Sequence, residues 1–317
     1  MRSDTMIERR TFLRTLACGA SLLPAARAVA ARNSFELDYI VASSMYGRMK
    51  LERILPEVPK TGAKYIDIWP EKHADQREQI EAMEHARFVR LLEDNGVRLG
   101  ILTHYDLGPF GLQDEMKVTR ELGGKMVIAG GSGPKGLQGA ELKTAVKQFI
   151  EKMKPHIKAA EDAGITIGIE NHANNLIESP DSMRWLAEFA PSPHIGVALA
   201  PYHLPQDPDA LARLIEDLGD GLVHFYAWQH GMGCHKKRLK EHELLQMPSR
   251  GPLDFKPLLT ALDKIGYKGW TEIFMHPVPR GIPILPTAAE VTAEINRSRE
   301  YLEGCLEQLR TDSKTSS

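Results

Sequence analysis

Eight short apolar runs, rich in Ile, Val and other β-type residues, alternate with longer segments of helical periodicity from residue 39 onward. This alternation is the sequence signature of parallel βαβ units, in which each strand is followed by a helix that packs back on the sheet. We predict the strands at 39–43, 65–69, 98–103, 125–129, 166–170, 195–199, 222–226 and 269–274.

The segments between these strands carry apolar residues three and four positions apart, as amphipathic helices do. The predicted helices lie at 75–95, 140–163, 182–189, 209–218, 255–265 and 287–309. Glycines stand at 96, 123, 164 and 266, where a helix must stop before the next strand. Eight such units close a barrel, so we predict the α/β class and a single (β/α)8 TIM barrel at 31–310, with a polar tail at 311–317.

The N-terminus has the pattern of a twin-arginine signal peptide over residues 1–30. An Arg-Arg pair at 9–10 precedes a mildly apolar stretch at 16–23, and an Ala-Val-Ala sequence follows at 28–30. The stretch is too short to span a bilayer permanently. We therefore expect the twin-arginine export machinery to deliver the chain to the periplasm or otherwise outside the cytoplasm, and cleavage to leave no integral membrane protein. A cytoplasmic amphipathic helix is the alternative.

The charge balance argues against nucleic acid as a partner. The whole chain has a formal net charge of −2, and removal of residues 1–30, with five basic and two acidic side chains, lowers it to −5. Binding to nucleic acid requires many cations on one surface. The net charge does not argue against small-molecule ligands.

Polar residues at the carboxyl ends of the predicted strands mark the candidate site, because barrel chemistry is located there. Strand 166–170 ends in Glu170, and His172 follows on the same face; strand 269–274 contains Glu272, with His276 beyond it. A carboxylate buried in an apolar strand is costly unless a cation or hydrogen-bond donors balance it. Two of them indicate a metal ion, and separate backbone or arginine partners are the alternative.

The order of these residues resembles the xylose-isomerase-like superfamily of sugar isomerases and epimerases, which also includes the family-two AP endonucleases. It consists of a Glu on strand five, His residues at the ends of strands six and seven, and a Glu on strand eight. The resemblance covers essentially the whole mature chain, including IGIENH at 167–172 and TEIF at 271–274. It implies that Glu170 and Glu272 are the catalytic acid and base.

The resemblance also implies a divalent metal ion, held in the family by Glu, Asp, His and Glu. On this chain the implied metal ligands are Glu170, His203, His224 and Glu272. Ala200 and Tyr226 occupy positions where the family has a ligating Asp and His. A mixed carboxylate and imidazole set suits Mn, Zn, Co or Fe, with Mg possible, and a pocket without metal is the alternative.

We therefore predict an exported sugar isomerase or epimerase that acts by metal-assisted proton abstraction next to a carbonyl, with a small-molecule sugar or glycoside as its partner. The predicted sugar contacts are Trp69, His104, Asn171, His172, Tyr202, Tyr226, Trp228, Gln229 and His276. Two other functions fit the sequence: a 3-keto-glycoside lyase or hydratase that uses the same proton abstraction, and a non-catalytic sugar-binding barrel.

Overall fold

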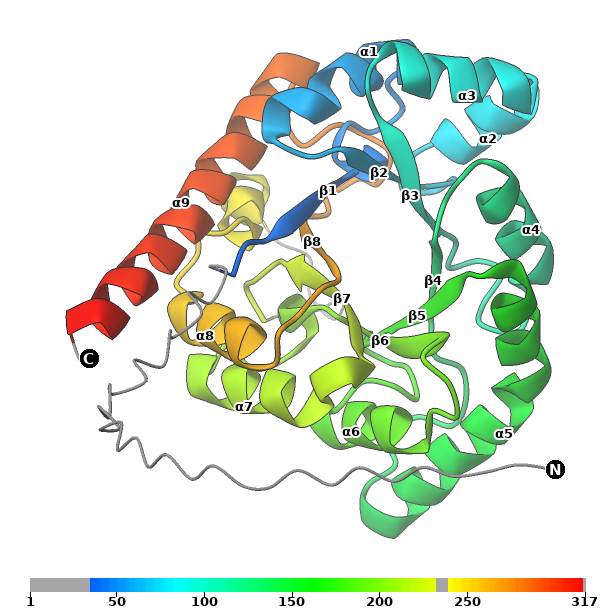
Figure 1. The fold of residues 1–317 in the computed structure, drawn as a ribbon, viewed down its shortest axis with the longest axis vertical. Coiled ribbons are helices and arrows are strands. Elements are labelled where there is room, and N and C mark those ends of the chain that lie inside the picture. Colours follow the sequence, from blue (N-terminus) through cyan, green and yellow to red (C-terminus); the bar gives the residue numbers. More distant parts are fainter. Residues whose placement is uncertain (1–34, 232–238, 316–317) are drawn as a thin grey trace, which may run out of the picture. The chain divides into compact units, whose positions relative to one another are not determined.

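The computed structural model describes residues 35–231 and 239–315, which form a closed barrel of eight parallel strands in sequence order (Figure 1). The predicted fold class is therefore confirmed. The strands are β1 (Asp38–Ala42), β2 (Tyr65–Ile68), β3 (Arg98–Thr103), β4 (Met126–Gly130), β5 (Thr166–Glu170), β6 (Ile195–Leu199), β7 (Leu222–Ala227) and β8 (Trp270–Ile273). The predicted signal peptide at 1–30 lies outside the described residues.

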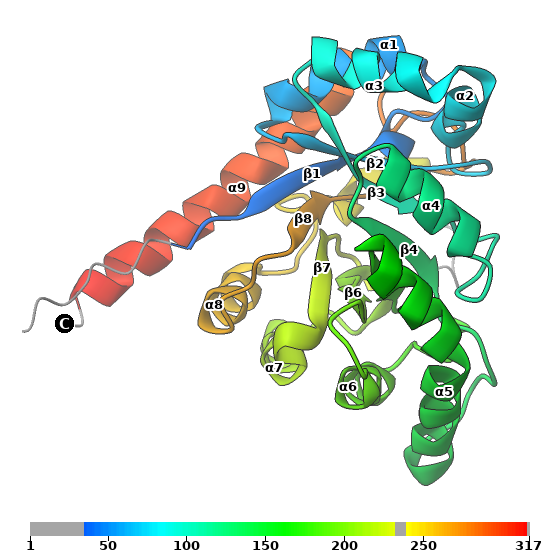
Figure 2. The same ribbon diagram turned by 45° about the vertical axis from the view of Figure 1, so that its right-hand side comes forward.

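Helices surround the barrel on its outer face, as the turned view in Figure 2 shows. The α-helices are α1 (Leu51–Ile54), α2 (Gln76–Ala82), α3 (His85–Asp94), α4 (Gln113–Glu121), α5 (Gly139–Ala163), α6 (Pro180–Phe189), α7 (Pro208–Leu218), α8 (Lys256–Lys264) and α9 (Ala288–Thr315). Short 3-10 helices are η1 (Ser43–Met45), η2 (Leu55–Thr61), η3 (Pro201–His203), η4 (Gly219–Gly221) and η5 (Lys240–Gln246). None of the described helices is long and apolar enough to cross a membrane.

The predicted strands agree with the observed ones within one residue at each end. The helices differ more. The segment predicted as one helix at 75–95 is two, because the backbone is extended at Met83 and Glu84. The four predicted helix-ending glycines are confirmed, and Gly164 ends α5 in the left-handed region at φ +64°, which a side chain disfavours.

Two helices differ from the sequence pattern for identifiable reasons. For helix α4 the sequence predicted the ending glycine, Gly123, but not the helix range, because the segment is mostly charged and only Glu115, Met116 and Thr119 are buried. Helix α9 continues through Thr315, past the predicted end at 309 and into the segment predicted as a polar tail. The helix continues because no Gly or Pro interrupts 305–315. An ion pair of 2.9 Å between Lys256 of α8 and Asp312 also holds this end of the helix.

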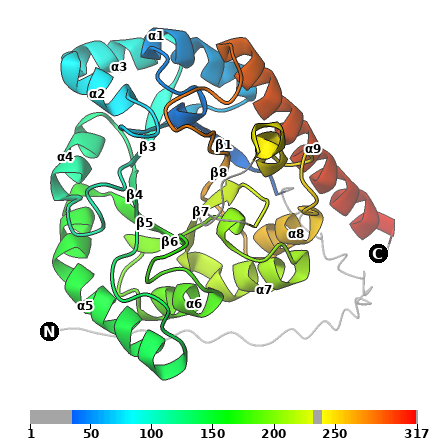
Figure 3. The ribbon, with the colours of Figure 1, turned by 180° about the vertical axis from the view of Figure 1, so that it is seen from behind.

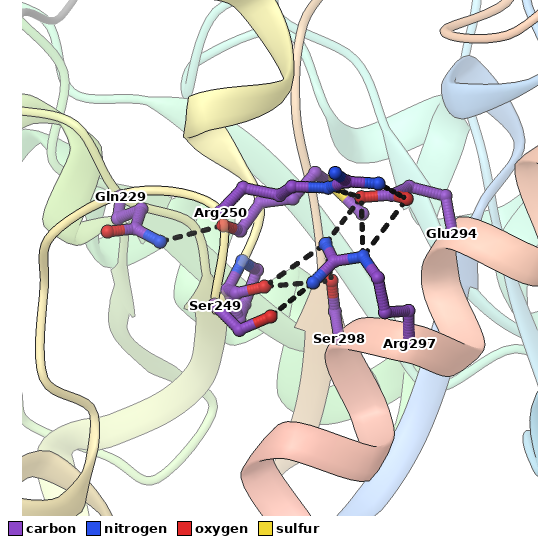
Figure 4. Close-up of polar contacts among 8 residues, drawn as sticks. Gln229, Ser249, Arg250, Glu294, Arg297 and Ser298 are labelled. Carbon is purple, nitrogen blue, oxygen red and sulfur yellow. Dashed lines mark hydrogen bonds and ion pairs between the residues drawn. The ribbon is translucent and has the colours of Figure 1, made fainter.

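A charged cluster fastens the turn after η5 to α9, and Figure 3 shows η5 beside that helix. Glu294 of α9 is buried and accepts hydrogen bonds from Arg250 at 3.0 and 2.8 Å (Figure 4). Arg297, one turn further on, donates to the same carboxylate and to Ser249. On the other side of the turn, Gln229 donates to the Met247 carbonyl at 2.7 Å. The loop after β7 is thereby connected to the last helix.

Removing the shared carboxylate of this cluster should destabilise the barrel. We expect Glu294→Ala to lower the free energy of unfolding by about 2 kcal/mol, less than a fully buried pair because Arg250 and Arg297 are partly exposed. Urea denaturation measures the change. Glu303→Ala on the same helix, where the carboxylate is 45% exposed, is the control and should stay within about 0.5 kcal/mol of the parent. Equal effects of the two substitutions would contradict the assignment.

Candidate functional site

Side chains at the carboxyl ends of the strands stand in layers inside the barrel, because alternate residues of a strand point to the same face. On β8 and the residues after it, Glu272 lies deepest, Phe274 above it and His276 at the rim. The same spacing places Asp67 below Trp69 on β2. We call the deepest set (Asp67, His224, Tyr226 and Glu272) the polar layer, and the set above it (Trp69, Trp228 and Phe274) the aromatic layer.

The aromatic layer covers the polar layer. The Phe274 ring stacks on Trp69 with centroids 5.3 Å apart and meets Trp228 edge-on at 4.9 Å. All three rings are at most 2% exposed. Phe274 also contacts the Tyr226 ring below it, at 5.4 Å. Tyr226, predicted as a sugar contact, is therefore part of the buried polar layer and does not line the rim.

Asp67 is a member of the polar layer that the sequence analysis missed. Its carboxyl group accepts a hydrogen bond from the Trp69 indole at 2.6 Å, and the single Thr103 hydroxyl lies 2.8 and 3.0 Å from its two oxygens, to which it donates. Burial raises the pKa of Asp67 well above its usual value despite these hydrogen bonds, and the charge of Glu170 adds to the rise. The available signal was one acid inside the apolar run YIDIW.

Glu272 pairs with a histidine of the neighbouring strand. Its Oε2 lies 3.0 Å from Nε2 of His224, and both side chains are fully buried. Burial raises the pKa of Glu272 well above its usual range, helped by the charges of Asp67 and Glu170, and burial lowers the pKa of His224 to about 3. At neutral pH the structure therefore favours a neutral carboxyl group facing a neutral imidazole.

Glu170 forms a second carboxyl–imidazole pair, closer to the rim. It ends β5, one step below His172, and its Oε1 lies 3.4 Å from Nε2 of His203, which follows β6. Burial raises the pKa of Glu170 to about 8, although the charges of His172 and Arg280 oppose the rise. This carboxyl group therefore exchanges its proton close to neutral pH.

Five side chains, from the loops after five different strands, form a ring at the rim, and the His203 side chain among them is only 1% exposed. This rim ring consists of His73, Tyr105, His172, His203 and His276. Its imidazoles come in two pairs: the centroids of His73 and His276 are 4.6 Å apart, and those of His172 and His203 are 4.4 Å apart.

Two larger side chains close this circle. The Tyr105 centroid lies 6.1 Å from that of His172 and 6.4 Å from that of His73. On the other side, Trp228 of the aromatic layer lies 5.3 Å from both His203 and His276. Tyr202, another predicted sugar contact, is buried and stacks on Trp228 at 3.9 Å.

Most of the rim ring is uncharged at neutral pH. Burial lowers the pKa of His73 to about 4 and that of His276 well below its usual value, and the positive charge of Arg280 acts in the same direction on both. Burial also lowers the pKa of His172. Neutral imidazoles both donate and accept hydrogen bonds, which is the chemistry that a polyhydroxylated ligand requires.

Three predicted sugar contacts have other partners in the structure. The Gln229 amide donates to the Met247 carbonyl at 2.7 Å and accepts from the Leu253 amide at 2.8 Å, so it holds the turn drawn in Figure 4. Asn171 makes two hydrogen bonds, of 3.1 and 2.7 Å, to the backbone of Ala200. Both side chains are fully buried, and they connect elements of the barrel instead of lining the rim.

His104 is the third of these. Its Nδ1 lies 3.6 Å from Glu115 on α4, and its ring makes none of the contacts that join the rim ring. The alternation along β3 explains the difference, because Thr103 points inward to Asp67 and the next residue points to the helices. The prediction of His104 as a sugar contact is therefore corrected.

The residues of the site do not fit a divalent metal ion. The four predicted ligands form two separate pairs, and in the described part of the chain no three His, Cys, Asp or Glu side chains are grouped so that they could hold an ion. Ala200 contributes a buried methyl group at the end of β6. The predicted ligand set of Glu170, His203, His224 and Glu272, with its Mn, Zn, Co or Fe ion, is not assembled by this geometry.

Fold and site together define a (β/α)8-barrel protein with an acidic interior beneath a rim of imidazole and aromatic rings. The family model described as xylose isomerase-like TIM barrel matches residues 55–301. The chain belongs to this family. Among curated protein sequences, none matches it.

Solved structures show the same fold at low sequence identity. An L-ribulose 3-epimerase has a TM-score of 0.65 and 16% identity, over 89% of this chain and 98% of that one. A protein named IOLI with a bound zinc atom has a TM-score of 0.64 and 15% identity, over 83% and 96%. A xylose isomerase-like TIM barrel/4-hydroxyphenylpyruvate dioxygenase fusion protein has a TM-score of 0.67 and 17% identity, over 89% of this chain and 45% of that one. This chain thus spans less than half of the fusion protein.

Proposed function

We propose that this chain is an exported sugar isomerase or epimerase that moves a proton at a carbon next to a carbonyl group. The observation that carries the proposal is Glu170, a buried carboxyl group at the end of β5 with an imidazole 3.4 Å away. A general acid or base works best when its pKa lies near the working pH, and the pKa of Glu170 is about 8. Similarity in fold to an L-ribulose 3-epimerase supports the same reaction class.

The proton transfers can be written with the residues of the chain and water. In its ionised form Glu170 removes the proton from the carbon next to the carbonyl, and the electron pair of that C–H bond moves onto the carbonyl oxygen to give an enediolate. In an isomerase Glu170 returns the proton to the former carbonyl carbon, while His203, beside Glu170, moves the hydroxyl proton of the first carbon to the former carbonyl oxygen. In an epimerase a water molecule protonates the opposite face of the same carbon, and Glu170 gives its proton to solvent.

The rim ring accounts for binding of the sugar hydroxyls. Neutral imidazoles of His73, His172 and His276 can donate to and accept from several hydroxyl groups without a charged partner. Tyr105, the partly buried aromatic member of the rim ring, provides apolar surface beside them, as sugar rings require. Export through the leader at 1–30 limits the substrate to free sugars or sugar derivatives found outside the cytoplasm.

Isotope exchange tests the proposal. Purified mature protein is incubated with L-ribulose or D-fructose in D2O, and the sugar is followed by proton NMR and mass spectrometry. We expect loss of the C–H signal next to the carbonyl and formation of an epimer or isomer that differs from the substrate only by the deuterium taken up. Binding of these ketoses with no exchange identifies a sugar-binding barrel instead. Release of an aglycone from a 3-keto-glycoside identifies a lyase.

A further inference from the structure

We infer that the acidic interior of this barrel works without a resident divalent ion, and that the Tyr226 phenol and two carboxyl–imidazole pairs occupy the interior where an ion requires open ligands. The inference rests on the proposed function for the location of the site. Its test measures bound metal and not turnover, so the two proposals can fail separately.

The first argument is the pairing of the side chains. A zinc or manganese ion needs three or four donor atoms directed at one point. Here Glu170 faces His203 at 3.4 Å, and Glu272 faces His224 at 3.0 Å, so each carboxyl group is matched with one imidazole from an adjacent strand. In the described part of the chain these side chains are therefore not grouped so that three of them could hold one ion.

The second argument is the position of Tyr226. It is in register with Glu272 on the neighbouring strand, it is fully buried, and its ring lies 4.4 Å from the His224 ring. The Tyr226 ring also contacts the Phe274 ring of the aromatic layer at 5.4 Å. A phenol is not among the donors that zinc or manganese prefers, and here it occupies the position next to Glu272 on the neighbouring strand.

The third argument is that the remaining acid of the polar layer already has partners. Asp67 accepts hydrogen bonds from the Trp69 indole at 2.6 Å and from the single Thr103 hydroxyl at 2.8 and 3.0 Å. Its carboxyl group is therefore turned toward these donors at β2 and β3, and in the described part of the chain it does not complete a ligand set with Glu272 and His224.

A fourth observation concerns the end of β6. Ala200 offers only a methyl group, and its backbone N–H and carbonyl are both bonded to Asn171. The end of β6 therefore offers no side-chain oxygen at position 200. The substitution that restores a donor there is also the sharpest test.

Metal content decides the inference. The mature protein is produced in medium supplemented with zinc and manganese, purified without chelator, and analysed by inductively coupled plasma mass spectrometry. We expect less than about 0.1 ion per chain, and a melting temperature that neither added zinc nor EDTA changes. About one ion per folded chain overturns the inference, whatever the result of the isotope exchange.

Two variants test whether the missing donor at position 200 and the phenol at position 226 are the reason that no ion binds. Ala200→Asp combined with Tyr226→His adds two donors and removes the phenol, and we expect it to take up about one zinc ion per chain and to melt at a higher temperature with zinc than with EDTA. Tyr226→Phe is the matched control, because it removes the hydroxyl group without adding a ligand, and it should stay metal-free. A folded double variant that takes up no zinc overturns the explanation. If the double variant does not fold, the metal content of the unsubstituted protein decides.

Discussion

Substitution Glu170→Gln is expected to reduce the exchange activity by about 10²- to 10⁴-fold, the usual contribution of a general acid–base group, and at the same time to make the protein more stable at pH 8. Activity falls because the amide cannot take a proton from carbon. Stability rises because the barrel no longer has to bury a carboxyl group that ionises. A residue with a purely structural role would show the opposite effect on stability.

The direction of the stability change follows from the pKa of Glu170. Its pKa is raised from 4.5 to about 8 by burial, so the folded state prefers the neutral acid. The stabilising effect of holding that proton is complete below pH 4.5 and is lost as the pH rises through 8. The parent therefore loses stability relative to Glu170→Gln across this interval, by up to several kcal/mol, because one pKa unit corresponds to about 1.4 kcal/mol.

Urea denaturation of both proteins at pH 5 and pH 8, together with the isotope exchange rate, measures the two effects. Glu188→Gln is the control, since Glu188 lies on the surface with a side chain 53% exposed and should change neither quantity. Loss of activity accompanied by an equal loss of stability at both pH values would show that Glu170 supports the fold and does not carry the chemistry.

The strands were predictable because their signal is local. A run such as TIGIE at 166–170 is apolar, rich in β-branched residues and bounded by a helix-ending glycine, and each of these features acts within a few residues. Helix α4 has a weaker periodic signal, because its exposed face is charged and its buried face includes Glu115. Its helix-forming residues and the following Gly123 are the local features that indicate a helix there.

The sequence predicted which strand ends carry the candidate site, but not how the side chains there contact one another. Sequence spacing placed Glu170 and Glu272 at the correct ends of β5 and β8. It did not show that Phe274, two residues beyond Glu272, is covered by Trp69 and Trp228, because the stagger of the strands sets which rings meet. It also did not show that both glutamates are buried, Glu170 at 2% and Glu272 at 0% exposure.

The sequence analysis also did not identify side chains that form hydrogen bonds to the backbone. Asn171 and Gln229 looked like ligands for hydroxyl groups because both are polar and follow a strand. Their partners, Ala200 and Met247, are 29 and 18 residues away, and nothing in the local sequence identifies a carbonyl or amide at that distance. Asp67 was missed for the same reason, since its hydrogen-bond partner Thr103 lies 36 residues further along the chain.

Outside the site, Arg77→Met is expected to cause the largest loss of stability, about 3 kcal/mol or more at neutral pH. Arg77 of α2 donates two hydrogen bonds, of 2.6 and 3.1 Å, to Glu115 of α4, and the two side chains are only 9% and 6% exposed. Methionine keeps most of the volume but leaves the Glu115 carboxylate buried, with only His104 nearby at 3.6 Å. Urea denaturation at pH 7 measures the loss.

The pH dependence separates this cause from a packing defect. Burial opposes ionisation of Glu115, but hydrogen bonds with His104 and Arg77 outweigh it and hold the pKa of Glu115 below its usual value. The pair therefore contributes stability above the unfolded pKa, and that contribution is lost as the pH falls through the folded pKa. In Arg77→Met the carboxyl group is easier to protonate, so the difference from the parent should shrink toward pH 4.

Two further variants complete the test. Arg87→Met removes an exposed arginine that lies 3.4 Å from Glu52 and should cost less than about 0.5 kcal/mol. Arg77→Met combined with Glu115→Leu should recover most of the loss, because replacing both members of a buried pair with apolar residues removes the uncompensated charge. If the double variant is no more stable than Arg77→Met alone, the guanidinium acts through its packing between α2 and α4 and not through its charge.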